Sequence, residues 1–271
     1  SNSSELFDFR NITLTDVDII LVQSGNDTVY GNASDNYIHG SGNNVFYGEG
    51  GNDTFLVYDQ ADTEYYGGSG TDTLLGDADD SYIYLYGGFD DSYGIEVIDG
   101  NGGYNRIYGS NSSELFDFRN ITLTDVDYVH AWGGDDTIYG GSGSLLLSLG
   151  SGDDIAVMDQ SASGNDDTIN DFNSSGNDTL ALEDDVFTFA SGDGTKAGVA
   201  LTDDTDIFDV ASNFSGGSFS AGGGATFLYD TTDGEVWYDA DGDGGGGTSV
   251  LIATISNYAT YTYDASDFTG W

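Results

Sequence analysis

The sequence predicts an all-β protein, in which a parallel β-roll or β-helix solenoid is followed by a C-terminal β-sandwich-like cap. The first observation behind this is a nine-residue spacing of large apolar residues after glycine-rich turns, which helical heptads cannot produce. The second is composition: the 271 residues include 42 Gly, 19 Tyr and 15 Phe, but no Pro and no Cys. The third is a formal net charge of -44, from 48 acidic and 4 basic side chains. Because a compact body with that charge repels itself, divalent cations are the natural compensation.

The repeat is most complete between Tyr66 and Leu75, which contain the nonapeptide G-G-x-G-x-D-x-U-x, with U a large apolar residue. This is the repeat of calcium-binding parallel β-helices. Its glycines can adopt positive φ and turn their carbonyls toward a shared point, where Asp72 adds a hard anionic oxygen. Because Ca2+ takes about six to eight oxygens, two neighbouring coils are expected to share each ion. Ca2+ in the glycine-rich turns is therefore expected to be part of the fold.

The U positions of the first half recur in steps of 9, 9, 8, 10, 9 and 9 residues. They are Val29, Ile38, Phe46, Phe55, Tyr65, Leu74 and Ile83. Two nonapeptides make one flattened coil with two short parallel strands, and β-branched and aromatic residues suit such strands. The segment 87–99 interrupts the count, and stacked coils are expected to continue to about residue 180.

A long duplication contains the short repeats. The eighteen residues from Ser1 to Asp18 return without change from Ser110 to Asp127. We therefore divide the chain into a first β-solenoid super-repeat (1–109), a second, shorter one (110–180) and a C-terminal cap or secretion-type domain (181–271). In that last part, alternating runs at 225–229, 235–238 and 249–255 predict antiparallel strands, and 212–224 reads as a flexible Gly/Ser loop. Such a unit would cover the last coil of the solenoid.

The candidate calcium ligands are the aspartates of the nonapeptides, together with glycines of the most complete repeat. They are Asp27, Asp53, Gly68, Gly70, Asp72 and Asp136, with less regular versions at Asp153 or Asp154, Asp167 and Asp178. Asn36, Asn44 and Asn105 replace the aspartate in other repeats. A neutral amide is a poorer calcium ligand, although Asn can form hydrogen-bonded ladders. We expect fewer ions than coils.

Two further features allow more than one reading. The residue after U faces outward on a strand, which predicts a broken tyrosine ladder on a surface of the roll. Its members are Tyr30, Tyr47, Tyr84, Tyr108 and Tyr139. The ladder fits ordinary cross-strand stacking as well as a face for self-association or glycan contact. The turn 239–244 imitates the start of an EF-hand loop but lacks the bidentate Glu, so a hairpin turn with at most a weak ion is expected.

The nonapeptides and a C-terminal tract resemble the RTX family, the calcium-binding repeat proteins that bacteria export by type I secretion. The C-terminal tract comprises 167–172, 178–182, 227–230, 237–242 and 265–268. The opening of each super-repeat is similar to segments that precede RTX blocks in large surface adhesins. The resemblance implies a right-handed β-roll, folding on meeting calcium after export, and an uncleaved C-terminal secretion signal.

Several functions are disfavoured by the residues themselves. The acidic charge makes nucleic acid and anionic membrane surfaces poor partners. No run of about 18 apolar residues exists, so membrane insertion is not expected. The sequence contains no H-E-x-x-H or G-x-S-x-G motif, and His39 and His130 show no metal-ligand spacing. Carboxylate pairs are too numerous to single out or exclude a glycosidase dyad. We expect no enzyme.

We therefore predict a calcium-stabilised, non-catalytic extracellular structural protein, such as a module of a surface layer, filament or adhesin. Its expected partners are Ca2+ and either further copies of itself or a cell-surface glycan. An extracellular location agrees with calcium sites that fill only at millimolar concentration. One alternative is the calcium-folding and secretion tail of a type I secreted enzyme. Another is a carbohydrate-binding module that uses the tyrosine face.

Overall fold

The structure is a computed structural model, and it describes residues 3–14, 19–57, 63–141, 143–158, 166–183, 199–200, 208–211, 227–239, 249–261, 263 and 267–270. The chain forms two compact units. Unit 1 comprises Ser1–Ser110 and Glu114–His130, and unit 2 comprises Asn111–Ser113 and Ala131–Trp271. The described residues contain one short 3-10 helix, η1 (Asp91–Tyr93), and no helix long and apolar enough to cross a membrane. The prediction of an all-β fold is confirmed.

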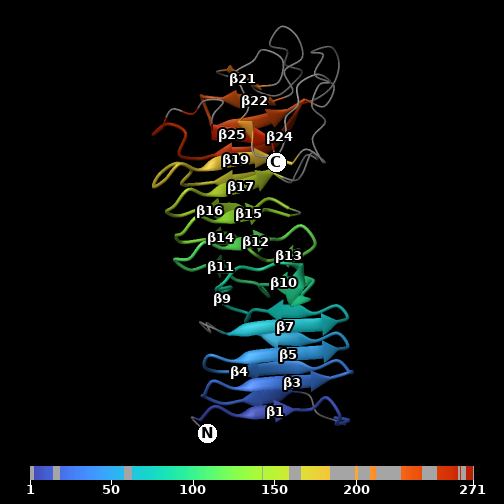
Figure 1. Ribbon diagram of the computed structural model, residues 1–271. Coiled ribbons are helices and arrows are strands. Elements are labelled where there is room, and N and C mark those ends of the chain that lie inside the picture. The colour runs from blue at the N-terminus through green and yellow to red at the C-terminus, as the bar shows by residue number, and fades with distance from the viewer. Residues whose placement is uncertain are drawn as a thin grey trace. The chain divides into compact units, whose positions relative to one another are not determined.

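Unit 1 is a solenoid of short parallel strands, stacked coil upon coil (Figure 1). Sheet I has the order β1-β3-β5-β7, sheet II β2-β4-β6-β8-β10-β13, and sheet III β9-β11-β14. In sheet I the strands are β1 (Leu6–Asp8), β3 (Thr28–Asn32), β5 (Val45–Gly50) and β7 (Glu64–Ser69). In sheet II they are β2 (Ile20–Val22), β4 (Tyr37–Gly40), β6 (Thr54–Leu56), β8 (Thr73–Leu75), β10 (Val97–Asp99) and β13 (Thr122–Thr124). In sheet III they are β9 (Tyr82–Tyr84), β11 (Arg106–Tyr108) and β14 (Tyr128–His130), and β12 (Leu115–Asp117) also belongs to unit 1.

The core of unit 1 is made by the predicted U positions, which lie in register from coil to coil. Val29 pairs with Phe46, which pairs with Tyr65, and on the other side of the coil Phe55 pairs with Leu74. None of the seven predicted positions is more than 3% exposed. The nine-residue count therefore located the core correctly, because strand residues two apart share a face.

The coils of unit 1 become longer after β8. Paired residues of successive coils are 17 apart between Val29 and Phe46, but 24 apart between Leu74 and Ile98. The longer coils add sheet III as a third side, and η1 lies in the segment 87–99 that interrupts the nonapeptide count. The interruption thus marks a change from two-sided to three-sided coils.

Unit 2 is also a parallel solenoid, and antiparallel strands continue its sheets. Its sheets have the orders β16-β18-β24-β23-β22-β21 and β15-β17-β19-β25-β20. The first contains β16 (Leu146–Ser148), β18 (Asp167–Ile169), β21 (Phe208–Ala211), β22 (Phe227–Asp230), β23 (Glu235–Tyr238) and β24 (Val250–Ile255). The second contains β15 (Thr137–Tyr139), β17 (Ile155–Met158), β19 (Thr179–Leu182), β20 (Val199–Ala200) and β25 (Phe268–Gly270).

The strands expected near the C-terminus are present as β22, β23 and β24, of which β23 pairs antiparallel with both others. β24 then pairs in parallel with β18, so the cap extends the solenoid sheet directly. The predicted loop 212–224 lies outside the described residues, as does most of the turn 239–244. The division into 1–109, 110–180 and 181–271 stays a prediction about the organisation of the sequence.

Candidate metal sites in the glycine-rich turns

A buried ladder of side chains runs along one line of turns in unit 1. Asp53, Asp72 and the half-buried Glu96 each stand directly before a strand of sheet II, and each accepts a hydrogen bond from the backbone of the preceding coil. The Asn36 N–H donates to Asp53 Oδ1 at 2.7 Å, and the Asp53 N–H donates to Asp72 Oδ1 at 2.6 Å. The Asp72 N–H donates to Glu96 Oε2 at 2.8 Å, which closes the ladder. The repeat count missed Glu96 because it falls in segment 87–99; its signal is an acidic residue directly before a strand.

The same bond recurs at the other predicted aspartates. The Glu5 N–H donates to Asp27 Oδ1 at 2.9 Å. In unit 2, the Asp136 N–H donates to Asp154 Oδ1 at 2.8 Å, and Asp154 N–H donates to Asp178 Oδ1 at 3.2 Å. Asp167 Oδ1 accepts from the Leu145 N–H at 2.9 Å. All seven of these buried aspartates are at most 4% exposed: Asp27, Asp53, Asp72, Asp136, Asp154, Asp167 and Asp178.

Asp153 is different from its neighbour Asp154, and the sequence left this choice open. Its side chain is exposed and accepts from the Asn177 N–H at 3.0 Å, while its own N–H donates to Asp135 Oδ1 at 3.0 Å. It belongs to a second, outer ladder on the turn surface. The buried place is held by Asp154, which directly precedes β17.

The second carboxylate oxygen of three ladder members lacks a hydrogen bond. Oδ2 of Asp53, Asp72 and Asp154 is buried and has no hydrogen-bond partner. A Cβ added to Gly48 would collide with both Asp53 Oδ2 and the Gly67 carbonyl oxygen, so these two oxygens face the same small space. Because an unsatisfied buried carboxylate is costly, this space favours a positive partner.

The next coil repeats the arrangement at Gly67, whose added Cβ would collide with Asp72 Oδ2 and the Gly94 carbonyl oxygen. Gly68 and Gly70 follow with φ of 108° and 146°, and both approach the backbone of the preceding coil closely. Their glycine identity is therefore required by the backbone. Their part as carbonyl ligands stays a prediction.

Burial and neighbouring carboxylates raise the pKa values of these side chains. Burial, together with the nearby charges of Asp72 and Asp35, raises the pKa of Asp53 to about 7. Burial likewise raises the pKa of Asp154 to about 7 and that of Asp178 to about 6, with neighbouring aspartates adding to both. The pKa of Asp72 is raised mainly by burial and also by Glu96. A cation at these positions would remove the cost of ionisation.

Two asparagines that stand in the aspartate position bond the turn carbonyls directly, without an ion. At Asn44, Nδ2 donates to the Gly42 carbonyl at 3.2 Å. At Asn105, Nδ2 donates to the carbonyls of Gly102 at 2.6 Å and Asp125 at 2.9 Å, while Oδ1 accepts from Ser81 N–H. The amide NH2 thus satisfies turn carbonyls, which a second carboxylate oxygen would repel. The turns of Asn44 and Asn105 therefore satisfy their own carbonyls, whereas Oδ2 of Asp53, Asp72 and Asp154 has no hydrogen-bond partner. Asp178 differs from these three, because its Oδ2 accepts a hydrogen bond from the Asn173 N–H at 2.6 Å.

The donor set fits a hard cation held by backbone and carboxylate together. In the part of the chain that the structure describes, no three His, Cys, Asp or Glu side chains are grouped to hold a metal. A carboxylate from one coil and main-chain carbonyls from the next are oxygen donors of the kind that Ca2+ prefers. We therefore name Asp53 with Gly67 and Asp72 with Gly94 as the residues of unit 1 that would hold it.

The predicted tyrosine ladder consists of two separate groups, and one predicted member is buried. Tyr30 stacks on Tyr47 at 4.6 Å and Tyr47 on Tyr66 at 4.8 Å between ring centroids. Because these rings cover one another's faces, this group fits cross-strand stacking. Tyr139 was wrongly placed on the surface: it is 9% exposed and packs with Val157 and Ala181, because the following coil covers it.

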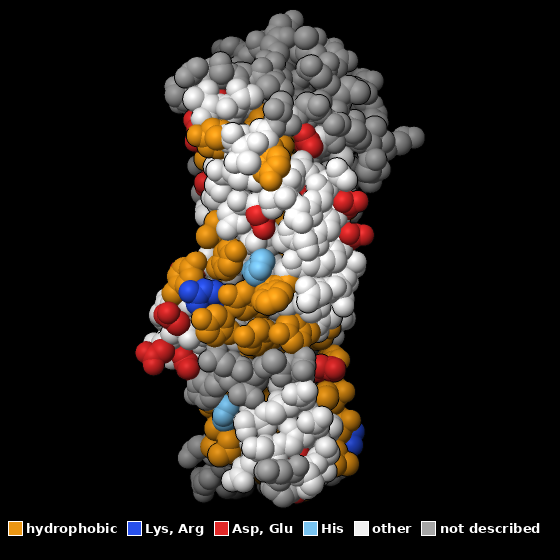
Figure 2. All heavy atoms as spheres, turned by 90° about the vertical axis from the view of Figure 1, so that its left-hand side faces the viewer, with side chains coloured by type: hydrophobic (Ala, Val, Ile, Leu, Met, Phe, Trp, Pro, Cys, Tyr) orange, Lys and Arg blue, Asp and Glu red, His pale blue; other side chains and the backbone are white. Residues whose placement is uncertain are grey.

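The second group, which we call the tyrosine platform, lies on sheet III. It comprises Tyr82, Tyr84, Tyr86, Tyr104, Arg106, Tyr108, Tyr128 and His130. Figure 2 shows hydrophobic side chains gathered on this side of the molecule. The Arg106 guanidinium lies 4.2 Å from the centroid of the Tyr104 ring and 5.2 Å from that of Tyr82. Tyr86 and Tyr104 are 39% and 38% exposed, so part of the platform is open to a partner.

A comparison with protein families agrees with this geometry. The family described as the RTX calcium-binding nonapeptide repeat (4 copies) matches residues 13–42, 40–64, 66–94, 90–117 and 123–144. These matches include the turns of Asp27, Asp53, Asp72 and Asp136. A search of curated proteins found none that matches the chain.

Proposed function

Because residues 13–144 belong to the RTX calcium-binding nonapeptide repeat family, we propose that this calcium-binding β-roll protein is a non-catalytic, extracellular structural module. In this proposal, calcium in the turns joins successive coils and allows the acidic chain to remain compact. A surface layer, a filament or an adhesin is the kind of assembly in which such a module serves.

The observation that carries the proposal is the buried, unpartnered Oδ2 of Asp53, Asp72 and Asp154. Each is one oxygen of a carboxylate whose other oxygen already bonds the backbone of another coil. Calcium, when bound, supplies the positive charge that lets these carboxylates remain ionised. The chain's own residues align the coils, hold the carbonyls in place and exclude water from the turn.

The extracellular location is supported by the calcium requirement and by the family, since RTX repeats are typical of secreted proteins. Sites built from few carboxylates bind weakly, and such sites fill at the millimolar calcium found outside cells. The acidic surface then keeps the folded protein soluble.

The absence of catalysis is supported by the surroundings of the two histidines. His39 lies on β4 with its Nδ1 at 3.3 Å from the Leu56 carbonyl oxygen, and the His130 ring contacts the rings of Tyr108 and Tyr128. Both therefore act as strand residues with structural contacts.

The tyrosine platform supports a contact with further copies of the protein or with a glycan. Exposed aromatic rings beside an arginine are typical of surfaces that bind partners. Carbohydrate binding is the second candidate function, and the exposed Tyr86 and Tyr104 favour it because sugar rings stack on open aromatic faces. A glycan array tests this candidate by comparing the unmodified chain with a Tyr86→Ala/Tyr104→Ala variant. The candidate is dismissed if the unmodified chain binds no glycan, or if the variant binds as well as the unmodified chain.

The main proposal is tested by circular dichroism and light scattering of the full chain in Ca2+, in Mg2+ and in chelator. We expect strand content and compactness in Ca2+ that are lost on chelation and not restored by Mg2+. Equal strand content and equal melting temperature in Ca2+ and chelator would overturn it. Electron microscopy of the calcium-loaded protein at high concentration then tests assembly, and a protein that stays monomeric and binds no cell or glycan surface would contradict that part.

A further inference from the structure

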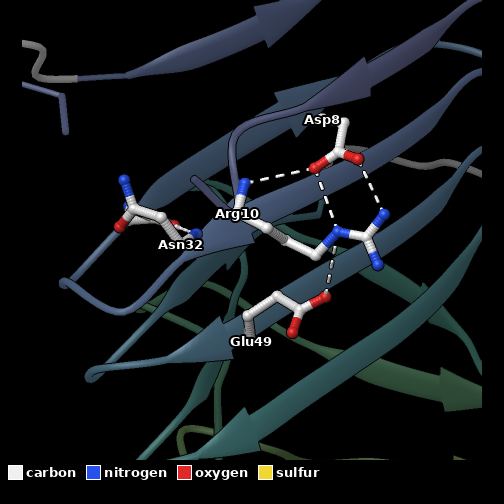
Figure 3. A network of polar contacts seen from close by, with 5 residues as sticks. Asp8, Arg10, Asn32 and Glu49 are labelled. Atoms are coloured by element: carbon white, nitrogen blue, oxygen red, sulfur yellow. Dashed lines mark hydrogen bonds and ion pairs between the residues drawn. The ribbon is translucent and has the colours of Figure 1, made fainter. Parts of the chain in front are cut away.

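The N-terminal edge of unit 1 can be compared with a second copy of itself. Residues 3–14 and 112–123 have the same sequence. They also share their local structure: Arg10 Nη2 lies 2.7 Å from Asp8 Oδ2, and Arg119 Nη2 lies 2.6 Å from Asp117 Oδ2. Figure 3 shows the first of these pairs, with Glu49 on the far side of Arg10. Because residues and ion pairs are the same, the difference in burial described next is attributed to what packs on each copy.

The two copies differ strongly in burial. Phe116 and Phe118 are 0% exposed and Ile121 is 3% exposed. In the first copy, Ile12 is 50% exposed, and the phenylalanines equivalent to Phe116 and Phe118 are only half-buried. The same apolar side chains are thus in a core in one place and on the surface in the other.

The preceding coil, residues 85–109, covers the second copy. The Phe89 N–H donates to the Leu115 carbonyl at 2.7 Å, and the Asp117 N–H donates to the Phe89 carbonyl at 2.8 Å. The rings of Phe89 and Phe118 lie 6.4 Å apart. Further along the same coil, the Thr122 N–H donates to the Glu96 carbonyl at 2.8 Å, and β10 pairs with β13.

The first copy has the same groups on an open side. β1 is the edge strand of sheet I and, among the described strands, pairs with β3 alone. The groups equivalent to those bonded by residues 85–109 are the Leu6 carbonyl and the N–H groups of Asp8 and Thr13. An edge strand with exposed apolar side chains is a template for a further strand.

We propose that the N-terminal edge of unit 1, formed by residues 5–13, is a docking surface for one further solenoid coil with the chemistry of residues 85–109. That coil supplies an aromatic residue in the place of Phe89, whose backbone bonds Leu6 and Asp8. It also supplies an apolar face for Phe7, Phe9 and Ile12. The proposal goes beyond calcium binding, since its contacts are apolar and main-chain; it needs the calcium-folded solenoid only as its platform. Docking of this kind would stack super-repeats into one continuous solenoid.

The test uses a cysteine as reporter, because the chain has no Cys of its own. Ile12→Cys places a thiol on the edge, and Ile121→Cys places one at the equivalent covered position. Each cysteine variant is measured in the full chain and in a fusion that carries an extra copy of residues 76–109 before Ser1. In the fusion, Gly109 of the added copy precedes Ser1, just as Gly109 precedes Ser110 in the chain itself. The matched control fusion carries Phe89→Asp in the added coil. The readout is the rate of maleimide labelling in Ca2+ at several protein concentrations.

We expect the added coil to slow labelling of the Ile12→Cys thiol at least about tenfold, toward the rate of Ile121→Cys, because labelling then requires local opening. In the Phe89→Asp fusion, labelling of the Ile12→Cys thiol should stay fast, because the added coil then lacks the aromatic residue that docks. Equal rates in the two fusions, with Ile121→Cys protected, overturn the proposal. Protection that grows with concentration in the unfused chain would identify a second copy as the occupant and also overturn it. Fast labelling of Ile121→Cys in Ca2+ would instead contradict the calcium-folded solenoid, and the docking surface with it.

Discussion

Asp72 accepts a hydrogen bond from the backbone N–H of Asp53, one coil earlier, through Oδ1, while its Oδ2 is buried without a hydrogen-bond partner. One oxygen of the carboxylate therefore joins two coils, and the other is left facing the Gly94 carbonyl. In the proposed function, the same side chain both joins two coils and holds the cation. The proposed function is based on this difference between Oδ1, which accepts a backbone hydrogen bond, and Oδ2, which has no hydrogen-bond partner.

Asp72→Asn should make the protein less dependent on calcium. The amide keeps an acceptor for the Asp53 N–H and offers an NH2 to the turn carbonyl, as Asn44 and Asn105 do. We expect calcium-free stability to rise by about 1–3 kcal/mol, the cost of an unsatisfied buried polar group. Chemical denaturation in chelator measures it. Asp72→Ala is the matched control, because it removes the acceptor as well and should weaken calcium-dependent folding more than Asn44→Ala does.

Asn44→Asp should have the opposite effect. It replaces an NH2 that bonds Gly42 with an anionic oxygen, so the free energy of unfolding in chelator should fall by roughly 1–3 kcal/mol. Added Ca2+ should recover the loss, because the new turn then resembles that of Asp53. A loss of stability that calcium does not recover would show that the turn geometry at Asn44 cannot accept an ion.

Gly48→Ala should block an ion site without touching a carboxylate. The added Cβ enters the space between Asp53 Oδ2 and the Gly67 carbonyl, and both are fixed by the backbone ladder. Gly50→Ala, on the same strand, is the control, because the closest contact of its Cβ would be the movable Ser69 Oγ at 3.0 Å, and its other neighbours lie at ordinary contact distance. We expect calcium titration to show one ion fewer for Gly48→Ala and no change for Gly50→Ala. Equal calcium binding by the two variants would place the ion elsewhere.

The calcium-free protein should become less stable as pH rises. The pKa values of Asp53 and Asp154, about 7 in the fold, lie above the ordinary value of about 4. A raised pKa contributes stability that is fully present below about pH 4 and is lost as pH rises through 7. Melting temperatures in chelator should therefore fall from pH 5 to pH 8. Calcium affinity should rise over the same range, because the ion competes with protons.

The control for this pH profile is Asp53→Asn/Asp154→Asn, which removes the two titrating groups. Its melting temperature in chelator should fall less steeply between pH 5 and pH 8 than that of the unmodified chain. Parallel profiles for the two proteins would assign the pH dependence to general charge repulsion.

The sequence was sufficient to locate the core and the buried aspartates, because both follow from a short local period. All seven U positions are buried, as are Asp27, Asp53 and Asp72. The third side of the later coils could not be predicted, since it depends on which distant strands pair. The same holds for Tyr139, whose burial is decided by the next coil.

The choice between Asp153 and Asp154 was open for a related reason. Both are acidic and adjacent, and only the register of β17 determines which one points inward. The role of Asn was foreseen as a weaker ligand, but its NH2 bonds to the turn carbonyls could be seen only with the backbone in place. Side-chain type is local information, whereas the direction of a turn carbonyl is set by the whole coil.

The most direct measurement is a crystal structure of the calcium-loaded protein, with anomalous scattering from Ca2+ or a lanthanide used to locate the ions. We predict ions beside Oδ2 of Asp53, Asp72 and Asp154, and none in the turns of Asn44 and Asn105. Ions in the turns of Asn44 and Asn105, or turns of Asp53, Asp72 and Asp154 that all remain empty while the solenoid is folded, would contradict the account.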